Sequence, residues 1–315
     1  MEVIAYDKAQ LNNTAVALGK FEGVHKGHML LIGKIVELAH NEHKNPNALD
    51  GGDEGVKSVV FTINMPNEIV INLDSERYDI FESCDVDYVC ECPFDERISR
   101  LSPYEFINNI LVEKLHASYV VVGEDFRFGY KRAGDIETLR KYAEVYNYEV
   151  VVFEKLRLED KIISSTIIRE LIEKGDVETV DKYMGRPYSV SGKVVYGKQL
   201  GRVIGFPTVN LIPDKRKKLP MVGAYETRIY IENDKTAYKA ITNVGNNPTV
   251  NESVNSENNA DIIIETHILD YSGDLYGKDI KVDFIRFLRP EMKFDNIEEL
   301  KNQLKEDKDK VNYQI

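Results

Sequence analysis

The sequence predicts an α/β domain with a parallel sheet, followed by an all-β domain that closes as a compact antiparallel barrel and ends in a helix. Strand-like runs alternate with amphipathic helical patterns in the first part of the chain. Short alternating strands at close spacing follow in the second part. The change occurs at Gly185-Arg186-Pro187, so residues 1–185 and 186–315 are the two predicted domains.

The strands of the first domain are runs rich in Val, Ile, Tyr and Ala. They are Thr14 to Gly19, Lys57 to Thr62, Val86 to Glu91, Ser118 to Gly123 and Tyr148 to Phe153. Helical patterns cover Lys26 to His40, Ser102 to Leu115, Gly134 to Tyr146, Ser165 to Lys174 and Val177 to Met184. Ligands in such folds bind at the carboxyl ends of strands, where Gly19 and Gly123 fall. The polar stretch Asn41 to Gly55 is typical of a surface loop.

The second domain shows period-two alternation between glycine and asparagine turns. The predicted strands are Tyr188 to Tyr196, Ala224 to Glu232, Ala237 to Asn243, Ala260 to His267 and Asp279 to Leu288. One helix, Asn296 to Glu306, follows them. This pattern favours an antiparallel barrel.

Composition limits the class of protein. The 315 residues suffice for two hydrophobic cores, and 53 acidic against 41 basic residues give a net charge of −12, which argues against nucleic acid as the main partner. No apolar run reaches the ~18 residues of a membrane span. No secretory signal precedes Cys84, Cys90 and Cys92, so we expect reduced structural thiols in a cytoplasmic protein. The Cys90-x-Cys92 pair lacks the further His or Cys that would complete a metal site.

The turn from Gly19 to His28 carries the clearest chemical signal. Three glycines allow close approach of a ligand, and the following helix offers free N–H groups at the positive end of its dipole. His25 and His28 form an H-x-G-H pair, which suits nucleotidyl transfer through positioning and charge neutralisation without a covalent nucleophile. We therefore expect a nucleoside triphosphate here. The alternative is a βα turn whose glycines serve geometry alone.

Further motifs follow in a fixed order along nearly the whole chain. In the first domain they are Gly19 to His28, then Val122 to Gly129 with Arg132 and Gly134-Asp135, and then Ile163 to Arg169. In the second they are Gly205 to Asn210, Asn243 to Gly245 with Pro248-Thr249, Glu265 to His267, Leu275 to Gly277, and Arg289 with Glu291 and Phe294. In this order they resemble the bifunctional prokaryotic riboflavin kinase/FAD synthetase family.

The resemblance implies a Rossmann-like nucleotidyltransferase domain and a riboflavin-kinase barrel. The barrel would phosphorylate riboflavin to FMN, and the first domain would adenylylate FMN to FAD with release of pyrophosphate. Both reactions would use ATP with Mg²⁺. Riboflavin, FMN and ATP are then the expected partners, and neither nucleic acid nor a membrane is expected. The resemblance is compatible with a homo-oligomer.

The family motif makes Glu265 the expected base for the riboflavin hydroxyl. Thr208 and Asn210 would hold Mg²⁺, since their i, i+2 spacing places both side chains on one face of an extended segment. The alternatives are an ordinary polar strand end for Glu265 and a loop-to-strand junction for Pro207 to Asn210. Residues expected near the ATP phosphates are Gly192, Gly201, Arg202, Gly205 and Pro207, although Gly192 also fits a hairpin. Arg289 and Glu291 are assigned to the flavin, or else pair with each other.

In the first domain, His25 and His28 would stabilise charge as the α-phosphorus is attacked. The other residues assigned to the nucleotide are Gly19, Phe21, Gly23, Gly27, Gly123, Asp125, Arg132, Ser164, Ser165, Thr166 and Arg169. One hydroxyl of the Ser164 to Thr166 group is also expected to cap the following helix.

Three positions of the first domain depart from the family pattern, and in the second domain Val209 stands where alanine is usual. Lys20 replaces an asparagine, Glu22 an aspartate, and Met65 the histidine of a proline-histidine-proline run. Met65 removes a possible phosphate donor. The alternatives are a riboflavin kinase that retains a degenerate adenylyltransferase domain, a flavin- or nucleotide-binding sensor, and a class I aminoacyl-tRNA synthetase. Intact Glu265, Thr208 and Asn210 oppose the sensor, and the charge balance opposes the synthetase.

Overall fold

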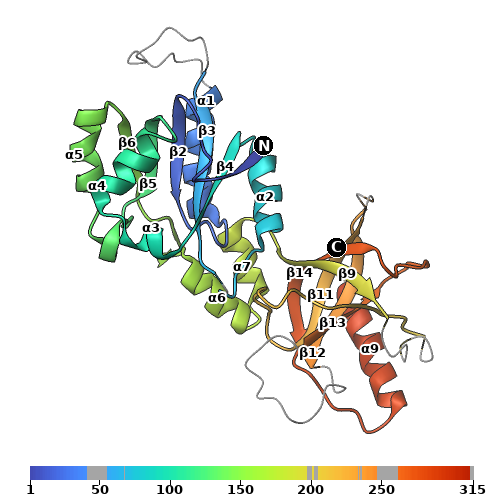
Figure 1. Ribbon diagram of the computed structural model, residues 1–315. Coiled ribbons are helices and arrows are strands. Elements are labelled where there is room, and N and C mark those ends of the chain that lie inside the picture. Colours follow the sequence, from blue (N-terminus) through green and yellow to red (C-terminus); the bar gives the residue numbers. More distant parts are fainter. Residues whose placement is uncertain are drawn as a thin grey trace. The chain divides into compact units, whose positions relative to one another are not determined.

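The computed structural model describes residues 1–40, 55–66, 68–196, 201, 205–232, 234, 236–246 and 262–312. The chain divides into two compact units, Met1–Glu68 with Asn72–Ser164, and Ile69–Ile71 with Ser165–Ile315 (Figure 1). Helices α6 (Ser165–Glu173) and α7 (Val177–Met184) thus pack with the second unit. The functional boundary between residues 185 and 186 stays a prediction. Residues 41–54 of the predicted loop lie outside the described residues.

The first unit is built on a six-stranded sheet in the order β1-β4-β3-β2-β5-β6, in which every neighbouring pair is parallel. The strands are β1 (Glu2–Ala5), β2 (Thr14–Gly19), β3 (Lys57–Asn64), β4 (Tyr88–Pro93), β5 (Ala117–Gly123) and β6 (Glu149–Phe153). The predicted parallel sheet is confirmed. After β4 the chain returns to the other side of β2, so the strand order reverses between β2 and β5. Ligands of open α/β sheets bind at such a reversal.

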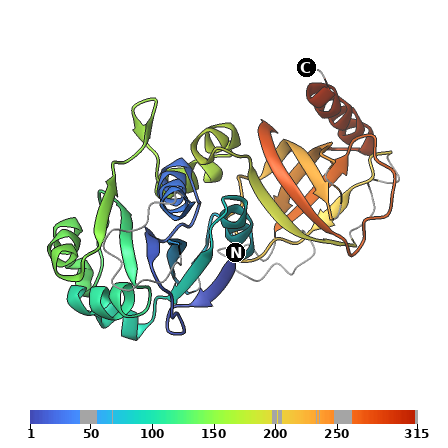
Figure 2. The same cartoon turned by 90° about the horizontal axis from the view of Figure 1, so that it is seen from above.

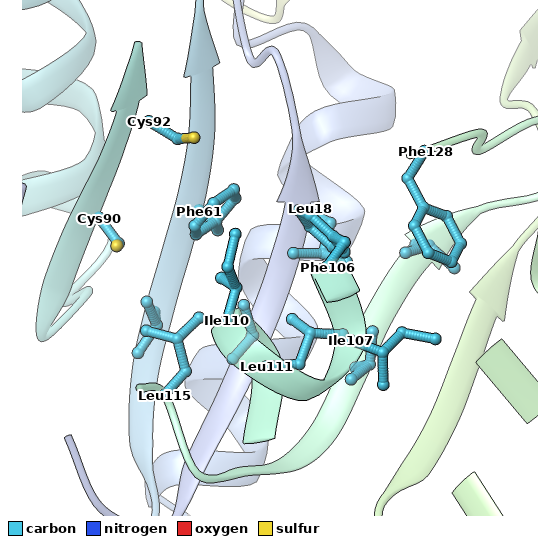
Figure 3. Close-up of a cluster of buried hydrophobic side chains, with 14 of the residues drawn as sticks. Leu18, Phe61, Cys90, Cys92, Phe106, Ile107, Ile110, Leu111, Leu115 and Phe128 are labelled. Carbon is cyan, nitrogen blue, oxygen red and sulfur yellow. The ribbon is translucent and has the colours of Figure 1, made fainter. Parts of the chain in front are cut away.

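Alternate residues of β2 face opposite sides of the sheet. Ala15 and Ala17 join a core with α1 (Lys26–His40) and α2 (Asp74–Ser83). Val16 and Leu18 join the other core, drawn in Figure 3. The helical elements on that second side are α3 (Glu96–Arg100), α4 (Pro103–Phe106), the π-helix η1 (Ile107–Val112) and α5 (Ile136–Tyr146). Helices therefore cover both faces of the sheet (Figure 2).

The predicted helix from Ser102 to Leu115 is divided in the structure. Ser102 caps α4 through a capping box with Glu105, and the chain then continues as η1. Ile107, Ile110 and Leu111 of η1 are buried against the sheet. The π-helix keeps the predicted apolar face but changes the backbone register. A short 3₁₀ turn, η2 (Tyr130–Arg132), and a hairpin of β7 (Arg157–Leu158) and β8 (Lys161–Ile162) complete the unit.

The second unit is a closed antiparallel barrel in the order β10-β13-β12-β11-β14-β9. Its strands are β9 (Tyr188–Val195), β10 (Val209–Leu211), β11 (Gly223–Ile231), β12 (Tyr238–Asn246), β13 (Ile262–Ile268) and β14 (Asp279–Arg289). The terminal helix α9 runs from Ile297 to Asn312 and lies along the outside of the barrel in Figure 1. The predicted barrel is confirmed. Strand β10 was not predicted, and α9 extends beyond its predicted end at Glu306.

Hydroxyl groups cross the barrel on the buried face of three strands. Thr242 Oγ1 lies 2.8 Å from Thr227 Oγ1 and 2.8 Å from Thr266 Oγ1. All three side chains are buried. Their neighbours Asn243 and Glu265 therefore point to the outer face of the barrel, because side chains alternate along a strand.

Candidate active sites

The first candidate site is the turn between β2 and α1. Phe21 and Val24 take positive φ values of 48° and 40° and are fully buried. A Cβ at Gly19 would come within 3.1 Å of the Phe21 ring, so the ring packs on the bare glycine backbone. Gly23, which lies between Phe21 and Val24 in the sequence, is also buried. The turn therefore folds toward the core.

His25 and His28 lie together at the start of α1. The backbone N–H of His28 donates to His25 Nδ1 at 3.3 Å, and the two rings stack with centroids 3.7 Å apart. Because His25 Nδ1 accepts this bond, the neutral ring carries its proton on Nε2. A Cβ at Gly27 would come within 3.1 Å of the His25 ring, which explains the glycine between the two histidines. The structure therefore brings the predicted histidine pair together.

A buried arginine holds the backbone of this turn through hydrogen bonds. Arg77 of α2 is 5% exposed and donates to Lys20 O at 3.1 Å and to Thr62 Oγ1 at 3.0 Å. Thr62 Oγ1 also donates to Lys20 O, and Arg77 Nη2 donates to Asn64 Oδ1 at 3.0 Å. The Asn64 amide in turn donates to Glu91 Oε1. The backbone of the Lys20 position is thus fixed by the ends of β3 and α2.

The turn after β5 lies beside the turn after β2, because the two strands are neighbours. Asp125 pairs with Lys155 at 2.9 Å, and Arg132 is exposed with a φ of 59°. A Cβ at Gly134 would come within 2.7 Å of the Phe128 ring, which accounts for that glycine by packing. Gly123 ends β5, as predicted.

The Ser164 to Arg169 motif crosses the division between the two units. Ser164 is the last residue of the first unit, whereas Ser165 and Thr166 open α6 in the second. Arg169 Nη2 donates to Ile69 O at 3.2 Å, within the second unit. The predicted helix start is confirmed, and the nucleotide contacts of these residues stay a prediction.

The second candidate site is a row of side chains across the outer face of the barrel. The strand register pairs Asn210 with Glu265, Glu265 with Asn243, Asn243 with Ala224, and Ala224 with Arg289. Directly opposed residues in antiparallel strands have Cβ atoms about 4.5–5.5 Å apart. Residues far apart in sequence therefore form one polar row, interrupted by the small side chain of Ala224.

A cavity of about 200 Å³ lies over this row. Glu265, Asn243, Arg289 and Glu291 line it, and its apolar wall comes from Phe206, Ile241, Met292, Phe294, Leu300 and Leu304. Leu300 and Leu304 belong to α9. The cavity thus joins a carboxylate and an amide to an apolar slot between the barrel and its terminal helix.

A second cavity of about 330 Å³ meets the first at Thr208, which lines both. Its other lining residues are Pro207, Val209, Thr266, Ile268 and the segment from Tyr271 to Tyr276. Thr208 therefore stands between two spaces, one of which contains Glu265.

Asn210 fits an oxygen ligand of a hard cation. Its side chain is 4% exposed, and Oδ1 has no hydrogen-bond partner among the described residues. A buried amide oxygen without a partner is costly, and Mg²⁺ prefers such oxygens. Thr208 precedes it by two residues, so the predicted pair fits the ion.

The glycines of the predicted phosphate loop differ in their surroundings. A Cβ at Gly201 would come within 2.2 Å of Phe206 O, and Phe206 N–H donates to Gly201 O at 2.8 Å. Gly205 has a φ of 85°. Gly192 instead lies within β9, where it pairs with Ile280 and packs on Leu211. Arg202 lies outside the described residues.

Arg289 has a partner that the sequence did not indicate. Its Nε donates to Asp307 Oδ2 at 2.9 Å, and Nη2 lies 2.8 Å from the same oxygen. Asp307 is a fully buried residue of α9. Arg289 thus joins the barrel wall to α9 while it lines the cavity with Glu291. Asn243 and His267 are two further lining residues to which the sequence gave no role of their own; their positions within the predicted motifs are the only signal that could have found them.

The cysteines lie in apolar surroundings. Cys90 and Cys92 are fully buried within the core of Figure 3, and burial raises the pKa of each thiol to about 12. In the described part of the chain, no three His, Cys, Asp or Glu side chains gather as a metal-ion site.

Two family models match the chain. One, described as riboflavin kinase, matches residues 184–315, and the other, described as FAD synthetase, matches residues 7–167. Among the described residues, no helix has the length and apolar character needed to span a bilayer.

Curated proteins and a solved structure are similar over nearly the full length. The bifunctional riboflavin kinase/FMN adenylyltransferase of Buchnera aphidicola subsp. Schizaphis graminum is 31% identical, over 94% of this chain and 92% of its own. The protein of the same name from Escherichia coli K12 is 31% identical, over 95% and 92%. A crystal structure described as a macrolide-efflux protein from Streptococcus pneumoniae has a TM-score of 0.84 at 26% identity, covering 99% of both chains.

Proposed function

The chain belongs to the bifunctional riboflavin kinase/FMN adenylyltransferase family, and we propose that its two candidate sites each carry one of these activities. Riboflavin is phosphorylated to FMN at the barrel, within residues 186–315. FMN is adenylylated to FAD at the turn after β2, within residues 1–185. ATP supplies both groups. The observation that carries this assignment is the polar row across the barrel, which places Glu265 beside Asn210 and beneath an apolar slot.

In the kinase reaction, the flavin ring occupies the slot between the barrel and α9. The ribityl 5′-hydroxyl then lies near Glu265, whose carboxylate accepts the proton as the hydroxyl oxygen attacks the γ-phosphorus of ATP. The bond from that phosphorus to the bridging oxygen breaks, and ADP leaves. ATP occupies the cavity on the other side of Thr208. Asn243 lies next to Glu265 and offers its amide to the same substrate.

Thr208 and Asn210 would hold the Mg²⁺ that accompanies ATP. The buried Oδ1 of Asn210, without a partner among the described residues, supports this assignment. A bound Mg²⁺ would neutralise charge on the transferring phosphoryl group. Gly201 and Gly205 precede Thr208 in the sequence, and their backbone would lie along the phosphates.

In the adenylyltransferase reaction, a phosphate oxygen of FMN attacks the α-phosphorus of ATP and pyrophosphate leaves. His25 offers its Nε2–H and His28 lies stacked beside it, at the N-terminus of α1. Both groups would stabilise charge that develops on the phosphate oxygens. Arg77 keeps the turn in place through Lys20 O. Gly123, Asp125 and Arg132 lie after the neighbouring strand and would contact the nucleotide or FMN.

The test is a product assay on the intact protein. Riboflavin with MgATP, and separately FMN with MgATP, are incubated with the wild type and with His28→Ala and Glu265→Gln, and flavins are resolved by chromatography. We expect FAD in both wild-type reactions. Glu265→Gln should stop FMN formation but keep FAD formation from FMN, and His28→Ala should do the reverse. Equal loss of both activities in either variant would contradict separate sites.

A further inference from the structure

His267 makes a hydrogen bond that the proposed chemistry does not use. Its Nδ1 lies 2.8 Å from the carbonyl oxygen of Pro207. A carbonyl oxygen only accepts, so the ring donates through Nδ1–H. Pro207 immediately precedes Thr208, which lines both cavities.

The position of His267 follows from the strand register. The β10–β13 ladder ends with the pair Val209–Thr266. One further step would set Thr208 opposite His267, but no backbone pair forms there. The imidazole of His267 instead reaches the backbone of Pro207. It thereby extends the link between the two strands past the end of β10.

Other contacts hold the ring in this position. Phe206 meets it edge to face with centroids 5.2 Å apart, and His267 lines the same cavity as Glu265. Burial lowers the pKa of His267 below its ordinary value, while the Pro207 carbonyl and the Asp270 carboxylate oppose this shift and Lys308 adds to it. The ring is therefore neutral near pH 7, with its one proton on Nδ1.

Two features of the described residues leave the segment that His267 holds with little rigidity of its own. Gly205 has a φ of 85°, and Pro207 has no N–H to donate. The Phe206 N–H bond to Gly201 O lies on the far side of Pro207 from Thr208. The imidazole thus restrains the orientation of the Pro207–Thr208 peptide through the Pro207 carbonyl.

We propose that His267 is a positioning residue for the kinase reaction: by donating Nδ1–H to the Pro207 carbonyl, it holds Thr208 in place to bind the metal–ATP complex. The inference rests on the proposed role of Thr208. The two residues then have different roles: His267 positions Thr208, whereas Glu265, two residues earlier on the same strand, acts on the riboflavin hydroxyl.

The shapes of Asn and Gln provide a matched test. The amide nitrogen of Asn occupies nearly the place of Nδ1, and that of Gln the place of Nε2. We expect His267→Asn to keep most of the kinase activity. His267→Gln and His267→Phe should lower kcat by up to about 100-fold, as a shift of about 1 Å at a reacting group does. The Gln and Phe variants should also need more Mg²⁺ for half-maximal rate.

Two controls accompany these measurements. FAD formation from supplied FMN should be unchanged in every variant, because its proposed site is built around the turn after β2 and not on the barrel strands. Riboflavin binding without ATP, followed by quenching of flavin fluorescence, should persist in the Gln and Phe variants and so report a folded barrel. Similar kcat and Mg²⁺ dependence in the Asn, Gln and Phe variants would overturn the proposal.

Thr208→Val separates this inference from the function on which it rests. If Thr208→Val leaves rate and Mg²⁺ dependence unchanged, the metal role of Thr208 fails, and the role of His267 fails with it. If Thr208→Val loses activity while His267→Gln keeps it, only the role of His267 is wrong. Loss in both, with recovery in His267→Asn, supports the proposal.

Discussion

At the scale of the single residue, the requirements of stability and of function conflict at Asn210. Its buried amide oxygen has no partner among the described residues, and such a group costs about 1–3 kcal/mol. The structure carries this cost at the position where the proposed reaction needs an oxygen ligand. Residues that lower stability at functional sites are expected from this trade-off.

We therefore expect Asn210→Leu to stabilise the barrel while it abolishes the kinase. Leucine has a similar branched shape without a polar atom, so the free energy of unfolding should rise by about 1 kcal/mol. Urea denaturation followed by circular dichroism measures the change, and FMN formation measures activity. Asn210→Asp is the matched control, since it keeps an oxygen ligand. An Asn210→Leu protein that is less stable and fully active would show that Asn210 is an ordinary core residue.

Met65 permits a gain-of-function prediction. It follows Asn64 at the end of β3 and is 36% exposed, so an imidazole fits there without repacking the core. Met65→His would restore a nitrogen donor at the position where the family has histidine. We expect faster FAD formation from FMN, measured as initial rates, with Met65→Leu as control. An unchanged rate would show that this donor does not limit the reaction.

At the scale of the element, α9 depends on a buried charge. Asp307 is fully buried, pairs with Arg289, and also accepts from Gln303. Removing one charge of a buried pair leaves the other uncompensated, at a cost of about 3–5 kcal/mol. Helix α9 contributes Leu300 and Leu304 to the cavity, so its position determines the shape of the slot.

We expect Asp307→Asn to raise the KM for riboflavin more than the KM for ATP, because the slot between α9 and the barrel is the proposed flavin site. Steady-state kinetics with each substrate varied in turn measures the difference. Lys310→Met is the control: Lys310 lies 3.8 Å from Asp307 and is half exposed, so its loss should cost at most about 1 kcal/mol. Equal increases in both KM values would contradict a local role of α9.

The elements that the sequence predicted well are those with a strong apolar period. Strand β2 and helices α1 and α7 have the predicted bounds. Helix α2 was not predicted because Asp74–Ser83 is mostly polar, and among its ten residues only Arg77 and Phe81 are buried. Strand β10 has three residues, too few to show alternation. Both elements owe their structure to tertiary contacts.

Tertiary contacts also account for the features of the site that the sequence did not predict. Glu265, Thr208 and Asn210 belong to motifs that can be read locally, and the barrel brings them together. The sequence suggests Glu291, two residues away, as a partner for Arg289, but the structure pairs Arg289 with Asp307, eighteen residues away on α9. The register that pairs Asn243 with Glu265 is likewise a property of the folded barrel. Motifs identify residues, whereas partners follow from the packing of elements.

At the scale of the whole molecule, buried acids predict loss of stability in alkali. Burial raises the pKa of Cys90 and Cys92 from 9.0 to about 12, and it also raises that of Tyr148 and Tyr225. Above pH 9 the unfolded chain loses thiol protons that the folded chain keeps, so the unfolded state is favoured as pH rises. Each thiol contributes about 1.4 kcal/mol per pH unit in this window.

We expect the melting temperature to be nearly constant from pH 7 to 8 and to fall between about pH 9 and 12. Differential scanning calorimetry across this range measures the fall. Replacing Cys90 and Cys92 together by Ala should make the fall shallower, although the absolute stability at pH 7 also drops through lost packing. Cys84→Ala, at a partly exposed site, is the control. An identical slope in the double variant would show that the thiols do not contribute.

The strand orders of the two units have a consequence for synthesis on the ribosome. All six strands of the parallel sheet in the first unit are present once Phe153 has emerged, since β6 is the last of them in the sequence. The barrel cannot close at that stage. Its first strand, β9, pairs with β14, so Tyr188 can take its place in the barrel only after Phe284 has been synthesised. Chains grow at about 5–20 residues per second, so the nucleotidyltransferase unit has several seconds to fold before the kinase barrel can close. The turn after β2, at which the last step of FAD synthesis is proposed, can therefore form before the kinase barrel closes.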